Sequence, residues 1–275
     1  MTGRPSPSLV VGGALTALLV ATAALSQLWT PEPPTRIRIA LRLRAPLEAG
    51  LLGTDHFGRD VLSQLMAGAW NSLAIAVPSV CLGAAIGTVV GCAAAALRGW
   101  PERIVLRVAD VVFAFPAVLS AIMVGALIGA GPVAGIVAIA AFNVPVFVRV
   151  SRAVALQVWT TDYVQAARAL GRHPIGITAT EVVPNIAGVL VVQLTIQLAL
   201  AILAEAGLSY LGLGVRPPNP SWGRMLADAQ TFLAAAPHLA IAPGISVAIS
   251  VLALNLLGEG LRDLLDPRNG AGRRS

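Results

Sequence analysis

Hydrophobic residues form six long runs along this chain, and shorter polar or turn-rich stretches separate the runs. Each run approaches the about 20 apolar residues that a helix needs to cross about 30 Å of hydrocarbon. We predict spans at about 9–29, 72–97, 111–128, 133–150, 186–206 and 237–257. Trp29, Trp70 and Trp100 flank the runs, as aromatic residues do at membrane interfaces. The pattern predicts an all-α integral membrane protein with six transmembrane helices.

Two of these runs contain features that predict helix geometry. Gly83, Gly87 and Gly91 form a stripe of small residues at four-residue spacing in the second run, which predicts close helix packing. Phe115-Pro116 in the third run predicts a kink.

The first run has two interpretations. Arg4 precedes it and Pro31 follows it, which is typical of a retained membrane anchor. Small residues between positions 21 and 24 also fit the processing site of a cleaved signal peptide. Because the run is longer than the about 7–15 residues of a signal-peptide core, we predict a retained anchor over residues 1–29.

A mixed stretch from 30 to 71 follows, which we expect to be an extracytoplasmic loop and surface helix. Between 36 and 44, arginines alternate with isoleucine and leucine, which is typical of a strand. This ribbon fits a basic edge for a partner or for anionic lipid heads, but we favour a solvated ribbon packed on the protein's own outer face. Turn residues at 52–60 and an amphipathic segment at 61–66 predict a surface helix that leads into the second span.

The charges orient the chain. Hydrophobic residues make up 56% of the sequence and charged residues 12%, and all 19 basic residues are arginine. A cytoplasmic N terminus places most of these arginines in short cytoplasmic loops, as the positive-inside rule requires. We therefore predict that both termini are cytoplasmic (N-in and C-in), with a transmembrane core over 72–268 and a cytoplasmic tail at 269–275.

The same composition excludes several kinds of chemistry. Because the chain contains no lysine, it cannot form a Walker A phosphate loop or a Schiff base, and it is not its own ATPase. Cys81 and Cys92 lie in one apolar run, too far apart along a helix for a disulfide. The three histidines have no metal-ligand spacing and are interpreted as loop residues. We predict no catalytic residue and no metal site.

The cytoplasmic stretch between the fourth and fifth spans contains a short helix of its own. Asp162 fits its N-cap, Gly171 fits its end, and Pro174 prevents its continuation. Helical spacing predicts one face with Tyr163, Ala166, Ala167 and Leu170, and another with Asp162, Gln165, Arg168 and Arg172. Docking into a groove on a soluble partner and packing on the protein's own inner face both fit this pattern.

Gln165, Ala166 and Ala167, followed by Gly171 and Pro184, resemble the EAA loop of ABC importer permeases. Further blocks resemble, in the same order, the C-type permease of dipeptide, oligopeptide and nickel importers. They are 52–55 with 58–63, Arg107 with Asp110 and Phe115-Pro116, 208–215 with 217–218 and 221–223, and 261–263 with 266–268. Two positions depart from the pattern: Gln165 replaces the usual acid of the triplet, and Glu181 stands where an apolar residue or histidine is common.

The resemblance implies a multi-pass permease of a bacterial inner membrane, with no cofactor in this chain. It implies membrane lipid and three kinds of protein partner: a homologous second permease, two ATP-binding subunits that hold ATP and Mg, and an extracytoplasmic substrate-binding protein. No nucleic-acid partner is implied. In this family the coupling helix sits in a cleft of the ATPase, which assigns coupling contacts to Asp162, Tyr163, Gln165, Ala166, Ala167, Arg168, Leu170, Gly171 and Pro184.

Three polar residues of the fifth span are candidates for the translocation path. Glu205 is an ionisable group in an apolar run, so it either meets a substrate amine or satisfies the loop that begins at Gly207. Gln193 and Gln197 line a polar path or hydrogen-bond to another helix. The resemblance makes peptides the first candidate substrate class, followed by nickel complexes and haem-like ligands. An ion-gradient-driven transporter is the rival, although the sequence lacks the cluster of intramembrane acids that such proteins use.

Overall fold

The computed structural model describes residues 6–115 and 117–265, and the regular structure in them is helical. The long helices are α1 (Pro7–Leu25), α2 (Val61–Leu97), α5 (Pro132–Trp159), α8 (Val183–Tyr210) and α10 (His238–Leu265). The shorter ones are η1 (Ile39–Leu41), α3 (Trp100–Ala114), α4 (Ala117–Ile128), α6 (Asp162–Ala169), α7 (Pro174–Ile177), the π-helical η2 (Thr178–Val182), α9 (Trp222–Ala229) and η3 (Gln230–Phe232). The predicted all-α class is confirmed.

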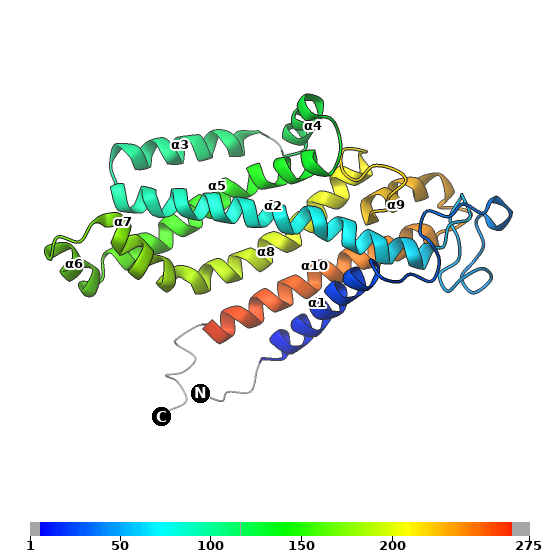
Figure 1. The fold of residues 1–275 in the computed structure, drawn as a ribbon, viewed down its shortest axis with the longest axis horizontal. Coiled ribbons are helices and arrows are strands. Elements are labelled where there is room, and N and C mark those ends of the chain that lie inside the picture. Colours follow the sequence, from blue (N-terminus) through cyan, green and yellow to red (C-terminus); the bar gives the residue numbers. More distant parts are fainter. Residues whose placement is uncertain (1–5, 116, 266–275) are drawn as a thin grey trace.

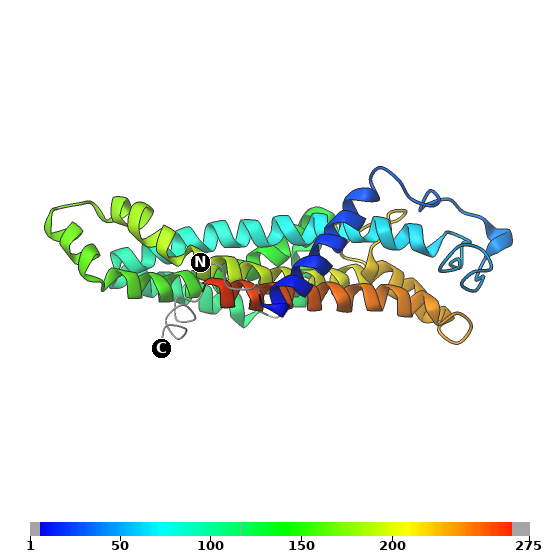
Figure 2. The ribbon, with the colours of Figure 1, turned by 90° about the horizontal axis from the view of Figure 1, so that it is seen from below.

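The helices form an elongated bundle (Figures 1 and 2). Helices α2, α5 and α8 run along its long axis, with α6 and α7 at one end and α9 with the loop after α1 at the other. Helix α10 runs from the α9 end back toward the α6 end, beside α1. The two ends of the bundle are therefore chemically distinct surfaces separated by its full length.

Five helices, α1, α2, α5, α8 (together with α7 and η2) and α10, are long and apolar enough to cross a membrane. The predicted third span differs from the structure. Helix α3 begins at Trp100, well before the predicted start, and α4 follows it at an angle of 91°. The break lies at the predicted Phe115-Pro116 kink, although Pro116 itself is outside the described residues. The described residues therefore contain five candidate apolar spans, or six if α3 and α4 together form one.

Helix α2 contains both the predicted surface helix and the predicted second span. Its 37 residues extend over about 55 Å, which exceeds the about 30 Å of a hydrocarbon core. The carboxylate of Asp60 caps its first turn by accepting the Ser63 N–H at 2.8 Å and the Ser63 hydroxyl at 2.7 Å. The predicted amphipathic segment at 61–66 leads directly into the second span within this one helix, and position 71–72, where we expected the domain boundary, lies inside it.

The predicted stripe of small residues on α2 packs against α5. A Cβ atom added at Gly87 would lie 2.6 Å from the Phe147 Cβ and 2.6 Å from the Val144 carbonyl oxygen. Such distances leave no room for a side chain, and Gly83 and Gly91 meet α5 equally closely. The close helix packing expected from the spacing of these glycines is confirmed.

The strand predicted at 36–44 is wrong. This segment contains the 3₁₀ turn η1, and its backbone bonds to a neighbouring turn rather than to a strand. The Arg38 N–H donates to the Phe57 carbonyl and the Leu43 N–H to the Asp55 carbonyl, both at 2.9 Å. Because Gly53 and Gly58 bend that turn with φ values of 76° and 74°, it offers no continuous ladder for an alternating segment to join.

Candidate coupling surface and buried polar sites

Helix α6 contacts the end of α5 and the short helix α7. Its Val164 and Ala167 are buried in a hydrophobic cluster that is separate from the main core. The other buried members of this cluster come from α2, α5, α7, η2 and α8: Cys92, Ala95, Ala155, Trp159, Ile177, Val182 and Ile186. Through this shared cluster, the buried face of α6 is connected to the ends of α2, α5 and α8.

The sequence predicted the end of α6 correctly but not its N-cap. Thr161, and not Asp162, is the N-cap residue, and its side chain makes no capping hydrogen bond. Asp162 is the first helical residue, where its charge still favours the helix dipole. At the other end Gly171 has φ 78°, its N–H donates to the Arg168 carbonyl at 2.9 Å, and the Arg172 N–H donates to the Ala167 carbonyl at 3.2 Å. This Schellman motif confirms the glycine stop.

The predicted faces of α6 are partly wrong. Ala167 was placed with Tyr163 and Leu170, yet Ala167 is buried while Tyr163 is 47% exposed and Leu170 is 84% exposed. The buried face instead follows Val164 and Ala167, three residues apart. Tyr163, Ala166 and Leu170 are left exposed, and Ile175 of α7 extends this apolar surface. An exposed apolar surface on a short helix is suited to insertion into a groove of another protein.

The two departures from the EAA pattern both make hydrogen bonds. The Gln165 side-chain amide donates to the Trp159 carbonyl at 2.6 Å, which satisfies a free carbonyl at the end of α5. A carboxylate at this position has no proton to donate. Arg172 bonds to the Glu181 carboxylate at 3.0 Å and to Thr180 at 2.9 Å, which ties the end of α6 to η2. Pro184 lies exposed in the first turn of α8.

Of the two glutamines on α8, one joins helices and the other does not. The Gln197 amide donates to the Asn143 side-chain oxygen at 2.8 Å, and Asn143 donates to the Ile139 carbonyl within α5. Gln197 is buried, so this bond links α8 to α5. Gln193 is half-buried and has no hydrogen-bond partner among residues 6–115 and 117–265. The contacts favour helix packing for Gln197, and a path role stays a prediction for Gln193.

Glu205 is enclosed where α8 meets α9. Its side chain is 1% exposed, and its Oε1 accepts a hydrogen bond from the Ser209 hydroxyl at 2.5 Å. The same hydroxyl accepts the Val215 N–H at 3.1 Å, so the chain of bonds fixes the loop after α8. Within the described part of the chain Glu205 Oε2 has no hydrogen-bond partner, and the Ser72 and Ser221 side chains lie beside the carboxyl. These contacts favour the loop interpretation.

Comparison with known proteins identifies the family. Residues 87–270 match the family model described as "Binding-protein-dependent transport system inner membrane component". The chain belongs to this family. The glutathione transport system permease protein GsiD of Pectobacterium atrosepticum is 39% identical over 260 residues, which cover 94% of this chain and 86% of that protein. GsiD of Escherichia coli is 42% identical over 216 residues, covering 78% and 71%.

The fold of this transport component also has a solved counterpart. The structure titled "Inward facing conformations of the MetNI methionine ABC transporter: CY5 native crystal form" matches with a TM-score of 0.62 and 19% identity, over 74% of this chain and 96% of that one. The resemblance to ABC importer permeases of the dipeptide and oligopeptide type is confirmed by these relatives.

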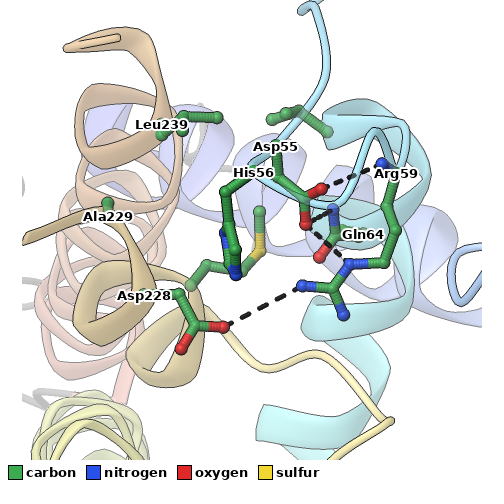
Figure 3. Close-up of a pocket in the computed structure, with 9 residues that line it drawn as sticks. Asp55, His56, Arg59, Gln64, Asp228, Ala229 and Leu239 are labelled. Atoms are coloured by element: carbon green, nitrogen blue, oxygen red, sulfur yellow. Dashed lines mark hydrogen bonds and ion pairs between the residues drawn. The ribbon is translucent and has the colours of Figure 1, made fainter. Parts of the chain in front are cut away.

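One polar cluster of this inner-membrane component received no role from its sequence. Asp55, Arg59 and Asp228 meet at the end of the bundle opposite α6 (Figure 3). His56 lies in the turn before α2, as expected of a loop residue, and it stacks on Phe232 with ring centroids 5.1 Å apart. Only the turn residues of the 52–60 block pointed to this cluster. In the described residues no group of three or more histidine, cysteine or acidic side chains is placed to hold a metal ion.

Proposed function

We propose that this chain is a permease subunit of an ABC importer for di- and oligopeptides. It forms half of the translocation path and couples it to ATP hydrolysis in partner subunits. The observation that carries the proposal is α6, a short helix with a glycine stop and an exposed apolar surface, whose buried face shares a hydrophobic cluster with the ends of α2, α5 and α8. The peptide class is supported by the relatives described above, which are glutathione transport permeases, because glutathione is itself a peptide.

The proposed topology has six spans, with α3 and α4 together as the third, and both termini in the cytoplasm. Helix α6 is then cytoplasmic, and α9 with the loop between α1 and α2 is extracytoplasmic. The excess of arginines in the loops on the α6 side supports this orientation. The protein is a multi-pass component of a bacterial inner membrane, with residues 1–29 as a retained anchor and 269–275 as a cytoplasmic tail; these tail residues lie outside the described ranges.

Three kinds of partner follow from this function: a second, homologous permease, two ATP-binding subunits that hold ATP and Mg, and an extracytoplasmic binding protein. The sequence without lysine supports the need for separate ATPase subunits. Closure of the ATPase dimer moves α6, and the buried pair Val164 and Ala167 transmits that movement to the long helices. The spans then switch between inward-facing and outward-facing arrangements.

The coupling surface comprises the residues predicted from the EAA resemblance, with their roles divided by exposure. Tyr163, Ala166 and Leu170 contact the ATPase, whereas Ala167 holds the helix in place and Gly171 ends it. Asp162, Gln165, Arg168 and Pro184 frame that surface. In the path itself, Gln193 is the candidate whose side chain retains unpaired hydrogen-bonding groups among the described residues, and Glu205 and Gln197 position the helices around it.

Co-purification and transport test the proposal together. The tagged chain should bring down two further kinds of subunit, a second permease and an ATPase, from membranes of its own organism. The complex in proteoliposomes should take up a labelled dipeptide only with ATP and the binding protein. Ion-gradient-driven uptake by this chain alone would overturn the ABC assignment. ATP-dependent uptake of a nickel complex or a haem-like ligand, without dipeptide uptake, would overturn the peptide class.

A further inference from the structure

A cleft of about 260 Å³ lies at the end of the bundle opposite α6, between the 56–64 segment and the loop and helix at 217–228. Figure 3 shows the adjoining pocket, which shares Arg59, Gln64 and Asp228 with the cleft. Phe57, Met225 and the prolines of the 217–220 loop contribute its apolar walls. Apolar walls with a few fixed charged groups are the usual composition of a small-ligand site.

Asp55 fixes the most buried cation of this cleft. Its Oδ1 accepts the N–H groups of Phe57 and Arg59, each at 2.9 Å. Its Oδ2 accepts the Arg59 Nε at 2.6 Å and the Gln64 amide at 3.1 Å. With four donors on one carboxylate, Asp55 has no capacity to spare for a ligand. It instead holds the Arg59 side chain, which is 12% exposed, in one orientation.

The far edge of the Arg59 guanidinium is unused. Its two terminal nitrogens have no hydrogen-bond partner in the parts of the chain that the structure describes, and the Asp228 Oδ2 lies 3.9 Å from Nη2. These nitrogens carry four of the five N–H donors of an arginine, arranged as a planar fork. A carboxylate is the group that such a fork binds with two parallel hydrogen bonds.

The remaining charges favour a zwitterion over a simple anion. Asp228 is paired with the Arg224 Nε at 3.1 Å through Oδ1, which leaves Oδ2 to the long contact with Arg59. Asp55, Arg59, Arg224 and Asp228 sum to zero net charge. A ligand that brings one carboxylate for Arg59 and one ammonium for Asp228 keeps this balance, whereas a bare anion adds an uncompensated charge to a half-enclosed site.

We propose that this outer cleft binds the free ends of a short peptide on its way into the importer. The terminal nitrogens of Arg59 receive the peptide C-terminal carboxylate, and Asp228 accepts from its ammonium group. The inference rests on the proposed function for its substrate class and for the outer position of the cleft. It assigns substrate contacts to this permease in addition to those that a binding protein makes.

A matched pair of probes tests the carboxylate contact. The assembled importer in lipid nanodiscs, without binding protein, is titrated with alanyl-alanine and with its C-terminal amide, and dissociation constants are measured by equilibrium dialysis. The dipeptide should bind at least about tenfold more tightly than the amide, because the amide cannot form the charge-assisted pair. Arg59→Lys should remove at least about tenfold of the dipeptide affinity, since lysine has no fork.

Arg44→Lys is the matched control, because Arg44 is on the same outer loop, is 54% exposed and lines no part of the cleft. It should bind both probes as the unmodified importer does. If Arg59→Lys fails to assemble, Asp228→Asn provides the second test. It should weaken alanyl-alanine binding and leave N-acetyl-alanyl-alanine binding unchanged, because that probe has no ammonium group. Equal affinity of the unmodified importer for dipeptide and amide overturns the proposal.

Two further results separate this inference from the proposed function. In the first, the unmodified importer takes up dipeptide with ATP, and the Arg59 and Asp228 variants bind it unaltered. This result overturns the binding role of the cleft and leaves the proposed function supported. Attachment of the peptide-free binding protein is measured in parallel. If Arg59→Lys weakens that attachment without changing dipeptide binding, the carboxylate comes from the binding protein, and the substrate site is overturned.

Discussion

Substitution of Gly171 tests the coupling role of α6 without introducing a clash. A Cβ atom added at this residue has nothing within 4 Å, so the steric term is absent. The cost comes from the backbone, because φ is 78° and an L-residue in this region costs about 1–2 kcal/mol. A residue that relaxes to negative φ instead breaks the Schellman hydrogen bonds to Ala167 and Arg168. Either way the last turn of α6 is weakened.

A cost of about 1–2 kcal/mol changes the ratio of formed to frayed helix by a factor of about 5–30. Because Leu170 and its apolar neighbours need that turn to keep their place, Gly171→Val should lower ATP-driven uptake while ATP hydrolysis continues. Gly171→Asn should be intermediate, since asparagine tolerates the left-handed region better than other residues. The assay measures dipeptide uptake per ATP hydrolysed by the importer in proteoliposomes, with membrane insertion checked separately.

Gly176→Ala is the matched control. Gly176 lies in α7 close to Gly171, its added Cβ also meets nothing within 4 Å, and its φ is not in the left-handed region. Alanine favours a helix over glycine by about 1 kcal/mol, so this variant should couple normally. Normal coupling in Gly171→Val, or an equal loss in Gly176→Ala, would refute the reasoning from the glycine stop.

Two further predictions concern the packing of the spans. Gly87→Val should lower the free energy of unfolding of the detergent-purified complex by about 1–3 kcal/mol, because the added side chain overpacks against α5. Gly13→Val is the control and should leave this free energy unchanged, because a Cβ added at Gly13 meets nothing within 4 Å. Equal stabilities of the two variants would contradict the close packing. Ser209→Ala should lower the free energy of unfolding by about 1–3 kcal/mol, because the Val215 N–H loses its hydrogen-bond acceptor. Glu205→Gln should keep near-normal uptake, because Glu205 bonds to Ser209 of the loop rather than to substrate. Lost uptake with unchanged stability in Glu205→Gln would place its carboxylate in the path.

Hydropathy predicted five of the long helices because apolar length is the property that a bilayer selects. It failed for α3, whose first part carries charged residues that lower the local hydropathy. In the structure, acidic residues of α3 pair with arginines of α5. Glu102 accepts a hydrogen bond from the Arg152 Nε at 2.6 Å, and Asp110 pairs with Arg149 at 2.6 Å. The pattern of residues within one segment cannot show that its charges will pair with a helix many residues later in the sequence.

Local patterns also failed where backbone geometry decided the outcome. The alternation at 36–44 had the period of a strand, but the neighbouring turn at 53–58 left it no ladder to join. The faces of α6 were assigned from polarity, although Val164 and Ala167 became the buried pair because they meet the cluster around Trp159. The glycine stop was predictable because one residue type suits its conformation.

The position of α6 gives the strongest mechanical argument. Its eight residues are too few to be a stable helix alone, so it depends on Val164 and Ala167 and on the hydrogen bond from Gln165 to Trp159. The same contacts that hold it folded attach it to α5 and α7 and, through the shared hydrophobic cluster, to α2 and α8. A partner that moves the exposed apolar surface of α6 must either move those helices or unfold α6. For coupling to work, the contacts of α6 with these helices must therefore hold while the partner applies its force through Tyr163 and Leu170.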